Sequence, residues 1–388
     1  MSSTITQRMN SLKIIINAAV ALVLLCSCNA GGATAAFSGG DTVKLEHAQL
    51  LHIIKHKGYT VVTIDDPWNK GKTLHTYVLV PDGMKSPVEK DDIGGNTTLV
   101  SIPLKRAVIT TSVHCGLVMN LGKDDAIRGT CDLNYINIPW IKQQHSIGKI
   151  ADCGNSTTPT LEKIISINAD AVLISPFQNS GGYGRLDEWG NPIIEMADYM
   201  ETSPLGRAEW MKFYGLLFGA EKEADSLFNK VEKNYNDLKA IADKSSTRLS
   251  MIIDKVEGPV WYVPGGRSTI GQMIADANAG YAFSDDKSSG SLQLTFETIL
   301  AKAGDADVWL YRYSPPATAS YASLLSEHHG YAQFKAFKER NVYACNTLAT
   351  TFYEDTPFRP DMLLRDFIII THPDLKNLGK PKYFTKLR

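Results

Sequence analysis

Several signatures of nucleotide-binding and hydrolytic proteins are missing from this chain of 388 residues. It has no GxxxxGK(S/T) phosphate-binding loop, no complete GxGxxG turn and no GxSxG nucleophile elbow. It also has no CxxC pair and no HExxH motif, so neither a zinc ribbon, a thioredoxin-like redox site nor a metalloprotease is indicated. These absences disfavour an exported α/β hydrolase such as an esterase. We therefore expect a protein that is not an enzyme.

The chain also has no large excess of positive or negative charge. Lys and Arg number 40 and Asp and Glu number 41, which gives a formal net charge of −1. Because proteins that bind nucleic acid usually carry a basic excess, no nucleic-acid partner is expected. After residue 25, no apolar run approaches the roughly 20 residues that a membrane-spanning helix requires.

The first 28 residues carry the strongest local signal. Arg8 and Lys13 precede an apolar stretch, residues 14–25, that is too short to cross a bilayer but suits a secretory signal. The stretch ends in Leu-Cys-Ser-Cys, which resembles the bacterial lipobox, with Cys28 as the acylated residue. We therefore predict a signal peptide over residues 1–27 and a lipidated flexible tether over residues 28–40. The protein is then a periplasm-facing, or more generally extracytoplasmic, lipoprotein held to the membrane by its lipid.

Four cysteines follow the signal, namely Cys115, Cys131, Cys153 and Cys345. An oxidising compartment would allow one or two disulfides among them, but the spacing does not fix the pairing. The simplest interpretation of each is a buried structural residue.

The pattern of strands and helices predicts an α/β fold in two halves. Residues 43–100 are β-rich, with strands expected at 58–64 and 74–80. Short apolar strands alternate with helices from residue 106 onward, which indicates parallel sheets covered on both faces. Residues 207–218 and 221–244 predict two helices broken at Gly219, the second long enough to bridge two lobes. The expected parts are residues 41–205, 206–245 and 246–388.

An internal repeat relates the two halves. Residues 160–165 lead to a strand at 170–174, and residues 295–300 lead to a strand at 307–311. Each segment predicts a helix with a glutamate, Glu162 or Glu297, in its first turn. An acidic residue there is ordinarily explained by the helix dipole, which favours it by about 0.3–1 kcal/mol. Because both halves carry the glutamate at the equivalent position, a shared role is indicated.

The chain resembles the substrate-binding proteins of ABC importers for iron-siderophores, haem and cobalamin. The order and spacing of several segments carry this resemblance, namely residues 106–110, 121–129, 159–162 with 169–172, 265–272 and 359–364. The resemblance covers residues 105–376. It implies two Rossmann-like lobes with mainly parallel sheets, joined by a single long helix, with the ligand cleft between them. It also implies that Glu162 and Glu297 lie at the outer tips of the lobes and dock onto arginines of the permease.

Ligands of open parallel sheets bind beyond the carboxyl ends of the strands. The loops expected there are rich in aromatic residues, which suit a large flat chelate, and in arginine, which suits carboxylate or catecholate groups. Each tyrosine has the alternative of packing half-buried, and Arg359 that of a structural ion pair. The candidate ligand-binding residues are His114, Tyr135, Trp140, Tyr183, Arg185, Trp261, Tyr262, Arg267, Tyr311, Tyr313, Tyr353 and Arg359.

His114 is also a candidate axial ligand of haem iron, opposite a tyrosine. The alternative is a histidine that caps a helix or donates a hydrogen bond to the ligand. No other residue is singled out as a metal ligand.

We therefore expect the substrate-binding component of an ABC importer, a monomer with no cofactor of its own. It would capture an iron complex, either a ferric siderophore or haem, and deliver it to a permease and its ATPase. A corrinoid such as cobalamin is an alternative cargo. A free metal ion is less favoured, because such sites usually use three or four His and carboxylate ligands. A lipoprotein that passes its ligand to another receptor, without a permease, is the remaining alternative.

Overall fold

The computed structural model describes residues 39–86, 95–178 and 182–388. The expected signal peptide, the lipidation site Cys28 and most of the expected tether lie before residue 39, outside the described residues. Within the described ranges, no helix combines the length and the apolar character that crossing a membrane would require.

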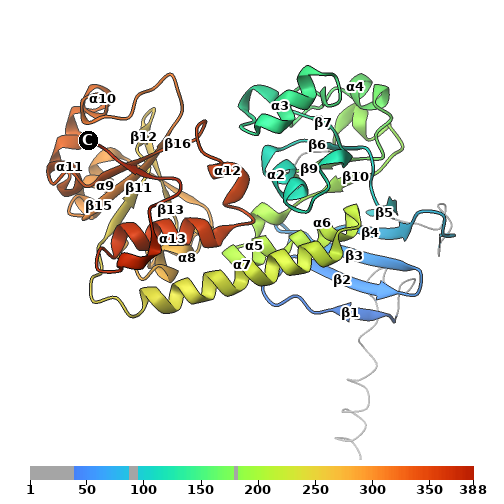
Figure 1. The fold of residues 1–388 in the computed structure, drawn as a ribbon, viewed down its shortest axis with the longest axis horizontal. Helices are drawn as coiled ribbons and strands as arrows, with labels where there is room; N and C mark the ends of the chain where they lie inside the picture. The colour runs from blue at the N-terminus through green and yellow to red at the C-terminus, as the bar shows by residue number, and fades with distance from the viewer. Residues whose placement is uncertain (1–38, 87–94, 179–181) are drawn as a thin grey trace, which may run out of the picture.

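The β-rich opening forms a sheet of its own beside the first lobe (Figure 1). Its neighbouring strands run antiparallel, except β4 and β5, which are parallel. The strands expected at 58–64 and 74–80 are confirmed as β3 and β4. In sheet order the strands are β1 (Asp41–Val43), β2 (Leu51–His56), β3 (Tyr59–Asp65), β4 (Thr73–Pro81) and β5 (Thr97–Ile102).

Two buried carboxylates fasten this sheet to the helical segment of the chain. Glu209 accepts the backbone N–H groups of residues 46–48, and Glu201 accepts those of Gln49 and Leu50, at 2.8–3.1 Å. Residues 46–50, between β1 and β2, therefore have their backbone donors satisfied without sheet pairing.

The first lobe contains a second five-stranded sheet, in which all strands are parallel and β6 is central. The order is β10 (Ile193–Glu195), β9 (Ala171–Ile174), β6 (Ala107–Ile109), β7 (Ile127–Thr130) and β8 (Ala151–Asp152). Strands β6 and β9 are buried along their whole length, as expected for a sheet covered on both faces. The helices of this lobe are α2 (Ser112–Asn120), α3 (Pro139–Ser146) and α4 (Leu161–Ser166).

The second lobe contains two sheets, one mainly parallel as expected and one antiparallel. Its larger sheet is parallel except for its last strand, in the order β11 (Met251–Ile253), β15 (Val308–Tyr313), β16 (Val342–Asn346) and β17 (Thr385–Lys386). An antiparallel sheet, not foreseen, consists of β12 (Val256–Glu257), β13 (Val260–Pro264) and β14 (Ser291–Leu294).

The helices of the second lobe surround these sheets (Figure 1). They are α8 (Thr269–Asp276), α9 (Phe296–Ala303), α10 (Tyr321–Glu327), α11 (Lys335–Lys338), α12 (Phe352–Asp355) and α13 (Pro360–Thr371). Short 3-10 helices occur in both lobes, at η3 (Asp124–Ala126), η4 (Leu133–Tyr135), η5 (Gly184–Leu186), η6 (Asp198–Met200), η7 (His329–Gln333) and η8 (Lys376–Leu378).

The helical segment consists of α5 (Pro204–Glu209), α6 (Met211–Phe218) and α7 (Glu221–Ala242). The predicted break is confirmed, since α6 ends at Gly219, whose φ of +61° favours glycine. The long helix α7 packs against α6 at one end and against α13 of the second lobe at the other (Figure 1). Its apolar stripe is buried, and the Tyr235 hydroxyl donates to Asp276 at 2.7 Å. Helix α7 therefore packs on the second lobe, and its Glu232 contacts His47 of the β-rich opening at 2.6 Å.

The internal repeat extends to the side-chain contacts. Asp170, just before β9, accepts the backbone N–H groups of Lys105 and Arg106, both at 2.8 Å. Asp307, just before β15, accepts the backbone N–H of Ser250 at 2.8 Å. In each lobe, the aspartate thus fixes the start of the neighbouring first strand, β6 or β11. The two halves share local geometry as well as sequence pattern.

The four cysteines Cys115, Cys131, Cys153 and Cys345 are free and buried, so none of the disulfides that the compartment would allow is formed. Burial raises the pKa of the Cys115 thiol to about 12 and those of Cys153 and Cys345 to about 11. They behave as small core residues rather than as reactive thiols.

Candidate ligand-binding site

The carboxyl ends of the parallel strands in the two lobes face each other. Asn137, in the loop after β7, donates from its side-chain amide to the carbonyl of Thr350, which follows β16, at 2.9 Å. Helix α2, which starts directly after β6, packs against α12 of the second lobe (Figure 1). The edge at which open parallel sheets bind ligands is therefore also the edge at which the lobes meet.

A cavity of about 620 Å³ opens on the second lobe at this edge. It is lined by three of the predicted ligand residues, Tyr262 from β13, Tyr313 at the end of β15 and Tyr353 from α12. Tyr262 and Tyr353 are 40% and 46% exposed, unusually high values for large aromatic residues. The structure brings these three tyrosines together around one space.

Arg312 lines the same cavity as these tyrosines. It forms a bidentate pair with Asp254, with donor–acceptor distances of 2.9 and 2.5 Å. Its guanidinium lies 5.7 Å from the ring centre of Phe352 and 5.8 Å from that of Tyr353. Burial alone would lower the pKa of Arg312, but Asp254 outweighs burial and raises it, so the cation is retained. Arg312 was not among the predicted contacts, although an arginine at the carboxyl end of a buried strand would have indicated it.

A second cavity of about 290 Å³ adjoins the first, and Arg312 and Asp254 line both. It is walled by apolar side chains such as Phe352 and by a second arginine, Arg207, from α5. Because two guanidinium groups face one largely apolar space, this part of the cleft suits a bulky ligand that carries anionic groups.

Arg207 is held by a buried network that begins at His114. The Nε2 atom of His114 lies 2.9 Å from Asp198, and Arg207 donates from Nε to the other oxygen of Asp198 at 3.0 Å. Burial alone would raise the pKa of Asp198, but His114 and Arg207 outweigh it and the pKa is lowered. Asp198 therefore orients Arg207 toward the cavity.

Three predicted ligand residues lie in the cores of the lobes instead. His114 and Tyr311 are each 2% exposed, and Trp261 is fully buried with its indole N–H donating to the carbonyl of Ile253 at 2.9 Å. Nε2 of His114 is occupied by Asp198, and Nδ1 is buried without a hydrogen-bond partner among the described residues, so in this conformation neither nitrogen is accessible from the cleft. In this conformation the three side chains lie in the core rather than in the cleft, and their ligand contacts, including His114 as an axial ligand, stay predictions.

Arg359 has a structural partner. It forms a bidentate pair with Asp361 at 2.9 and 2.9 Å at the start of α13, and Asn234 of α7 donates to the same carboxylate at 3.2 Å. Its side chain is only 17% exposed. The alternative of a structural ion pair, left open by the sequence, is the arrangement that the structure has.

The remaining predicted residues do not converge on one site. In the first lobe, Tyr135 is 79% exposed after β7, and Trp140 is half-buried at the start of α3. Tyr183 donates to Glu195 at 2.7 Å and lines a separate cavity of about 340 Å³. Arg185 pairs with Glu162, and Arg267 is exposed just before α8.

Two exposed aromatic residues of the first lobe were not among the ligand residues predicted from the sequence. Phe177 follows β9 and Tyr199 follows β10, and they are 47% and 37% exposed. The Tyr199 hydroxyl donates to the carbonyl of Pro176 at 2.6 Å, which joins the two loops. Their position a few residues after buried strands is the signal that could have identified them.

The two glutamates expected to dock onto a permease occupy equivalent positions. Glu162 is the second residue of α4 and Glu297 the second residue of α9, and both are exposed. Glu162 accepts from Arg185 at 2.7 Å, and its own backbone N–H together with Arg185 lowers the pKa of its carboxyl group. Glu297 has no side-chain partner within the described residues.

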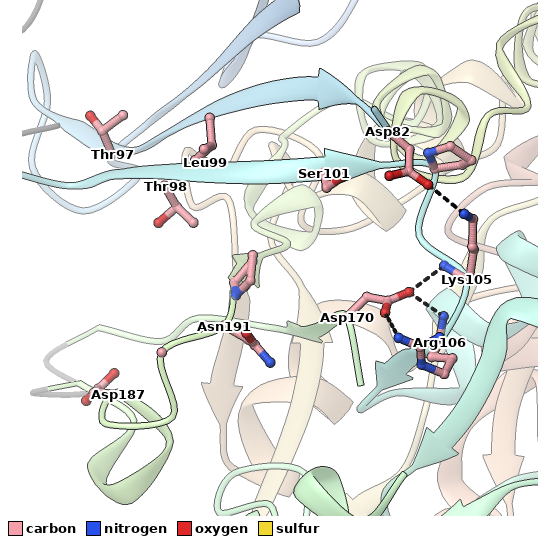
Figure 2. Close-up of a pocket in the computed structure, with 13 residues that line it drawn as sticks. Asp82, Thr97, Thr98, Leu99, Ser101, Lys105, Arg106, Asp170, Asp187 and Asn191 are labelled. Atoms are coloured by element: carbon pink, nitrogen blue, oxygen red, sulfur yellow. Dashed lines mark hydrogen bonds and ion pairs between the residues drawn. The ribbon is translucent and has the colours of Figure 1, made fainter. Parts of the chain in front are cut away.

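A larger cavity, of about 810 Å³, lies outside the interlobe cleft (Figure 2). It separates the edge strand β5 from the amino ends of β6, β9 and β10. Its charged side chains are already paired, Lys105 with Asp82 at 2.7 Å and Arg106 with Asp170 at 2.6 Å (Figure 2). Because it lies at the amino ends of the parallel strands and away from the contact between the lobes, we do not assign the main ligand to it.

Within the described residues, no group of three or more His, Cys, Asp or Glu side chains is arranged to hold a metal ion. The alternative of a free metal as cargo thus has no ligand set in this part of the chain.

Residues 108–347 match the model of a known family, described as periplasmic binding protein. The chain belongs to the periplasmic binding protein family. Members of this family bind a substrate rather than convert it. Among its relatives is an uncharacterized lipoprotein of Methanocaldococcus jannaschii, MJ0878, which is 29% identical over 347 residues, or 83% of this chain and 81% of the relative.

Two solved structures are similar in fold. A periplasmic heme binding protein from Pseudomonas aeruginosa has a TM-score of 0.56 at 16% identity, covering 73% of this chain and 98% of its own. A protein of an ABC-type Fe3+-hydroxamate transport system from Saccharomonospora viridis has a TM-score of 0.53 at 16% identity, covering 69% and 93%. The two-lobed fold expected from the sequence is thereby confirmed.

Proposed function

We propose that this protein is the lipid-anchored, substrate-binding component of an ABC importer and that it captures an iron chelate, either a ferric siderophore or haem. The observation that carries the proposal is the position of Arg312 and Arg207 in one cleft, with Tyr262, Tyr313 and Tyr353 beside Arg312. Guanidinium groups pair with the carboxylates or catecholates of such chelates, and aromatic rings cover their apolar faces.

The relatives support this class of cargo without selecting one member. The two solved structures are named for heme and for Fe3+-hydroxamate transport, and the Methanocaldococcus relative is named as a lipoprotein. A corrinoid on the same scaffold is the second candidate, because its amide-bearing ring would also use aromatic contacts but would gain less from two arginines.

Delivery to a permease and its ATPase is the second half of the proposal. Glu162 and Glu297 are exposed at equivalent positions of the two lobes, one on each repeat. A pair of carboxylates at matching places suits two cationic sites on a symmetric membrane partner. The protein itself needs no cofactor, and it acts as a monomer.

Calorimetric titration of the purified protein tests the cargo. A ferric catecholate, a ferric hydroxamate, haemin and cyanocobalamin would each be added at matched pH and ionic strength. We expect one of the three iron ligands to bind with one-to-one stoichiometry and the corrinoid to bind more weakly. Saturable binding of the corrinoid alone would favour the second candidate, and the absence of any binding would contradict the proposed cleft.

A further inference from the structure

Glu354 is a buried carboxylic acid at the contact between the lobes. It lies on α12 of the second lobe and is 5% exposed. Its partners belong to the first lobe, since the backbone N–H of Asn137 donates to Oε1 at 3.4 Å and the Ser112 hydroxyl also interacts with the carboxyl group. The other oxygen, Oε2, is buried without a hydrogen-bond partner within the described residues. Burial raises the pKa of this group.

In the part of the chain that the structure describes, no Lys, Arg or His side chain pairs with Glu354. Helix α2 contributes Ser112 and the buried thiol of Cys115, the loop after β7 contributes Asn137, and α12 itself contributes Asp355. The approach is also close, because a Cβ atom on Gly116 would lie 3.3 Å from the carbonyl oxygen of Glu354. Water therefore reaches this carboxyl group only if α12 and α2 separate.

The same short helix forms the wall of the ligand cleft. Phe352 lines the smaller cavity and Tyr353 the larger one, while the intervening contact with the first lobe is made by Glu354. A change in how α12 rests on α2 would thus move the aromatic surface that faces the ligand. The contact between the lobes and the shape of the cleft therefore both depend on α12.

We propose that Glu354 acts as a positioning residue that opposes contact between the lobes, so that the cleft is held partly open until a ligand offsets the burial of its carboxyl group. This inference rests on the proposed ligand cleft. When the lobes are apart, the carboxyl group is hydrated and ionised. When they meet, it must lose its water or take up a proton, and either change disfavours the contact.

The test measures the distance between the lobes in the absence of ligand. Spin labels at Lys142→Cys on α3 and Ala322→Cys on α10, both exposed, would report this distance in the mature chain with Cys28→Ser. The four remaining cysteines are buried and should stay unlabelled. We expect Glu354→Gln to shorten and narrow the distance distribution, because it removes the ionisable group and keeps the shape of the side chain.

Two further variants serve as controls for the direction of the change in the distance between the lobes. Asn137→Ala removes a favourable contact to Thr350 and should lengthen the distance, whereas Glu339→Gln, the same change at an exposed site of the second lobe, should leave it unchanged. If Glu354→Gln lengthens the distance as Asn137→Ala does, or changes nothing, the proposal is wrong. Because no ligand is present, this outcome is independent of the cargo titration.

A second measurement, the rate at which a bound probe dissociates, tests whether Glu354 affects ligand binding. For whichever probe binds, Glu354→Gln should slow dissociation by about fivefold to tenfold, since burying a neutral amide avoids the cost of dehydrating or protonating a carboxylate, which is at least of that order. Faster dissociation in Glu354→Gln would show that the residue supports lobe contact and would overturn the inference.

Discussion

The guanidinium of Arg185 lies 2.7 Å from the carboxylate of Glu162, on the exposed surface of the first lobe. The sequence had suggested separate roles for them, a ligand contact for Arg185 and permease docking for Glu162. Glu297, at the equivalent position of the second lobe, has no such partner within the described residues. The two expected docking sites therefore differ in charge although the repeat relates them.

Reversing the charge of both glutamates tests the docking role. Glu162→Lys and Glu297→Lys together should abolish uptake of the ligand by cells that contain the cognate permease, because cationic sites on the partner would then be repelled. The affinity of the purified variant for the ligand should stay within about twofold, since neither residue faces the cleft. Glu339→Lys, an exposed glutamate outside the repeat, is the control. Normal uptake by the double variant would contradict the docking assignment.

Replacing Arg185 tests whether its guanidinium pairs with Glu162 in solution. The pKa of Glu162 is lowered by its own backbone N–H and by Arg185, so Arg185→Ala should raise this pKa toward its ordinary value. A carboxyl-detected NMR titration would measure the change. The Glu297 signal serves as an internal reference and should not move. An unchanged Glu162 titration would mean that the two side chains are not paired in solution.

Arg359 should matter for stability and not for binding. Arg359→Ala would leave Asp361 buried beside only Asn234, and breaking such a pair costs about 3 kcal/mol. Urea unfolding followed by circular dichroism should show this loss, while ligand affinity changes by less than about threefold. A large loss of affinity at unchanged stability would restore Arg359 to the ligand site.

The lowered pKa of Asp307 predicts that the stability of the fold depends on pH. Burial alone would raise its pKa, but Lys335 and Ser250 outweigh burial, so the pKa is lowered in the folded protein. A group with a lowered pKa stabilises the fold above its ordinary pKa of about 4, and this contribution is lost as the pH falls through the folded value. Asp307→Asn should therefore be less stable than the native protein at pH 7, by a margin that shrinks below pH about 4. A margin that is constant down to pH about 3 would contradict this role.

The sequence could predict most of the fold because local patterns and tertiary contacts agree. The stripe of α7, the break at Gly219 and the repeat around Asp170 and Asp307 each depend on nearby residues and recur in the structure. The antiparallel sheet β12–β14 was missed, since β12 has only two residues and α8 separates β14 from β13 in the chain. Pairing between distant short strands leaves no periodic signal in a single sequence.

The ligand site could be predicted only in part, because sequence position does not determine the direction of a side chain near a strand end. Tyr311 and Arg312 are neighbours in β15, yet the first is buried and the second lines the cleft. Trp261 and Tyr262 alternate in the same way along β13. His114 lies near the expected strand end, in the first turn of α2, but its ring faces inward to Asp198, a partner 84 residues away that no local pattern reveals.

The most direct test of the proposed cleft compares two arginines of the second lobe. Arg312→Ala removes a guanidinium that lines both parts of the cleft, and Arg267→Ala removes an exposed one that lines neither part. For the ligand identified by titration, Arg312→Ala should weaken binding at least about tenfold, as expected for lost charge-assisted hydrogen bonds, and Arg267→Ala less than about twofold. Equal affinity of the two variants and the native protein would place the ligand elsewhere and contradict the account.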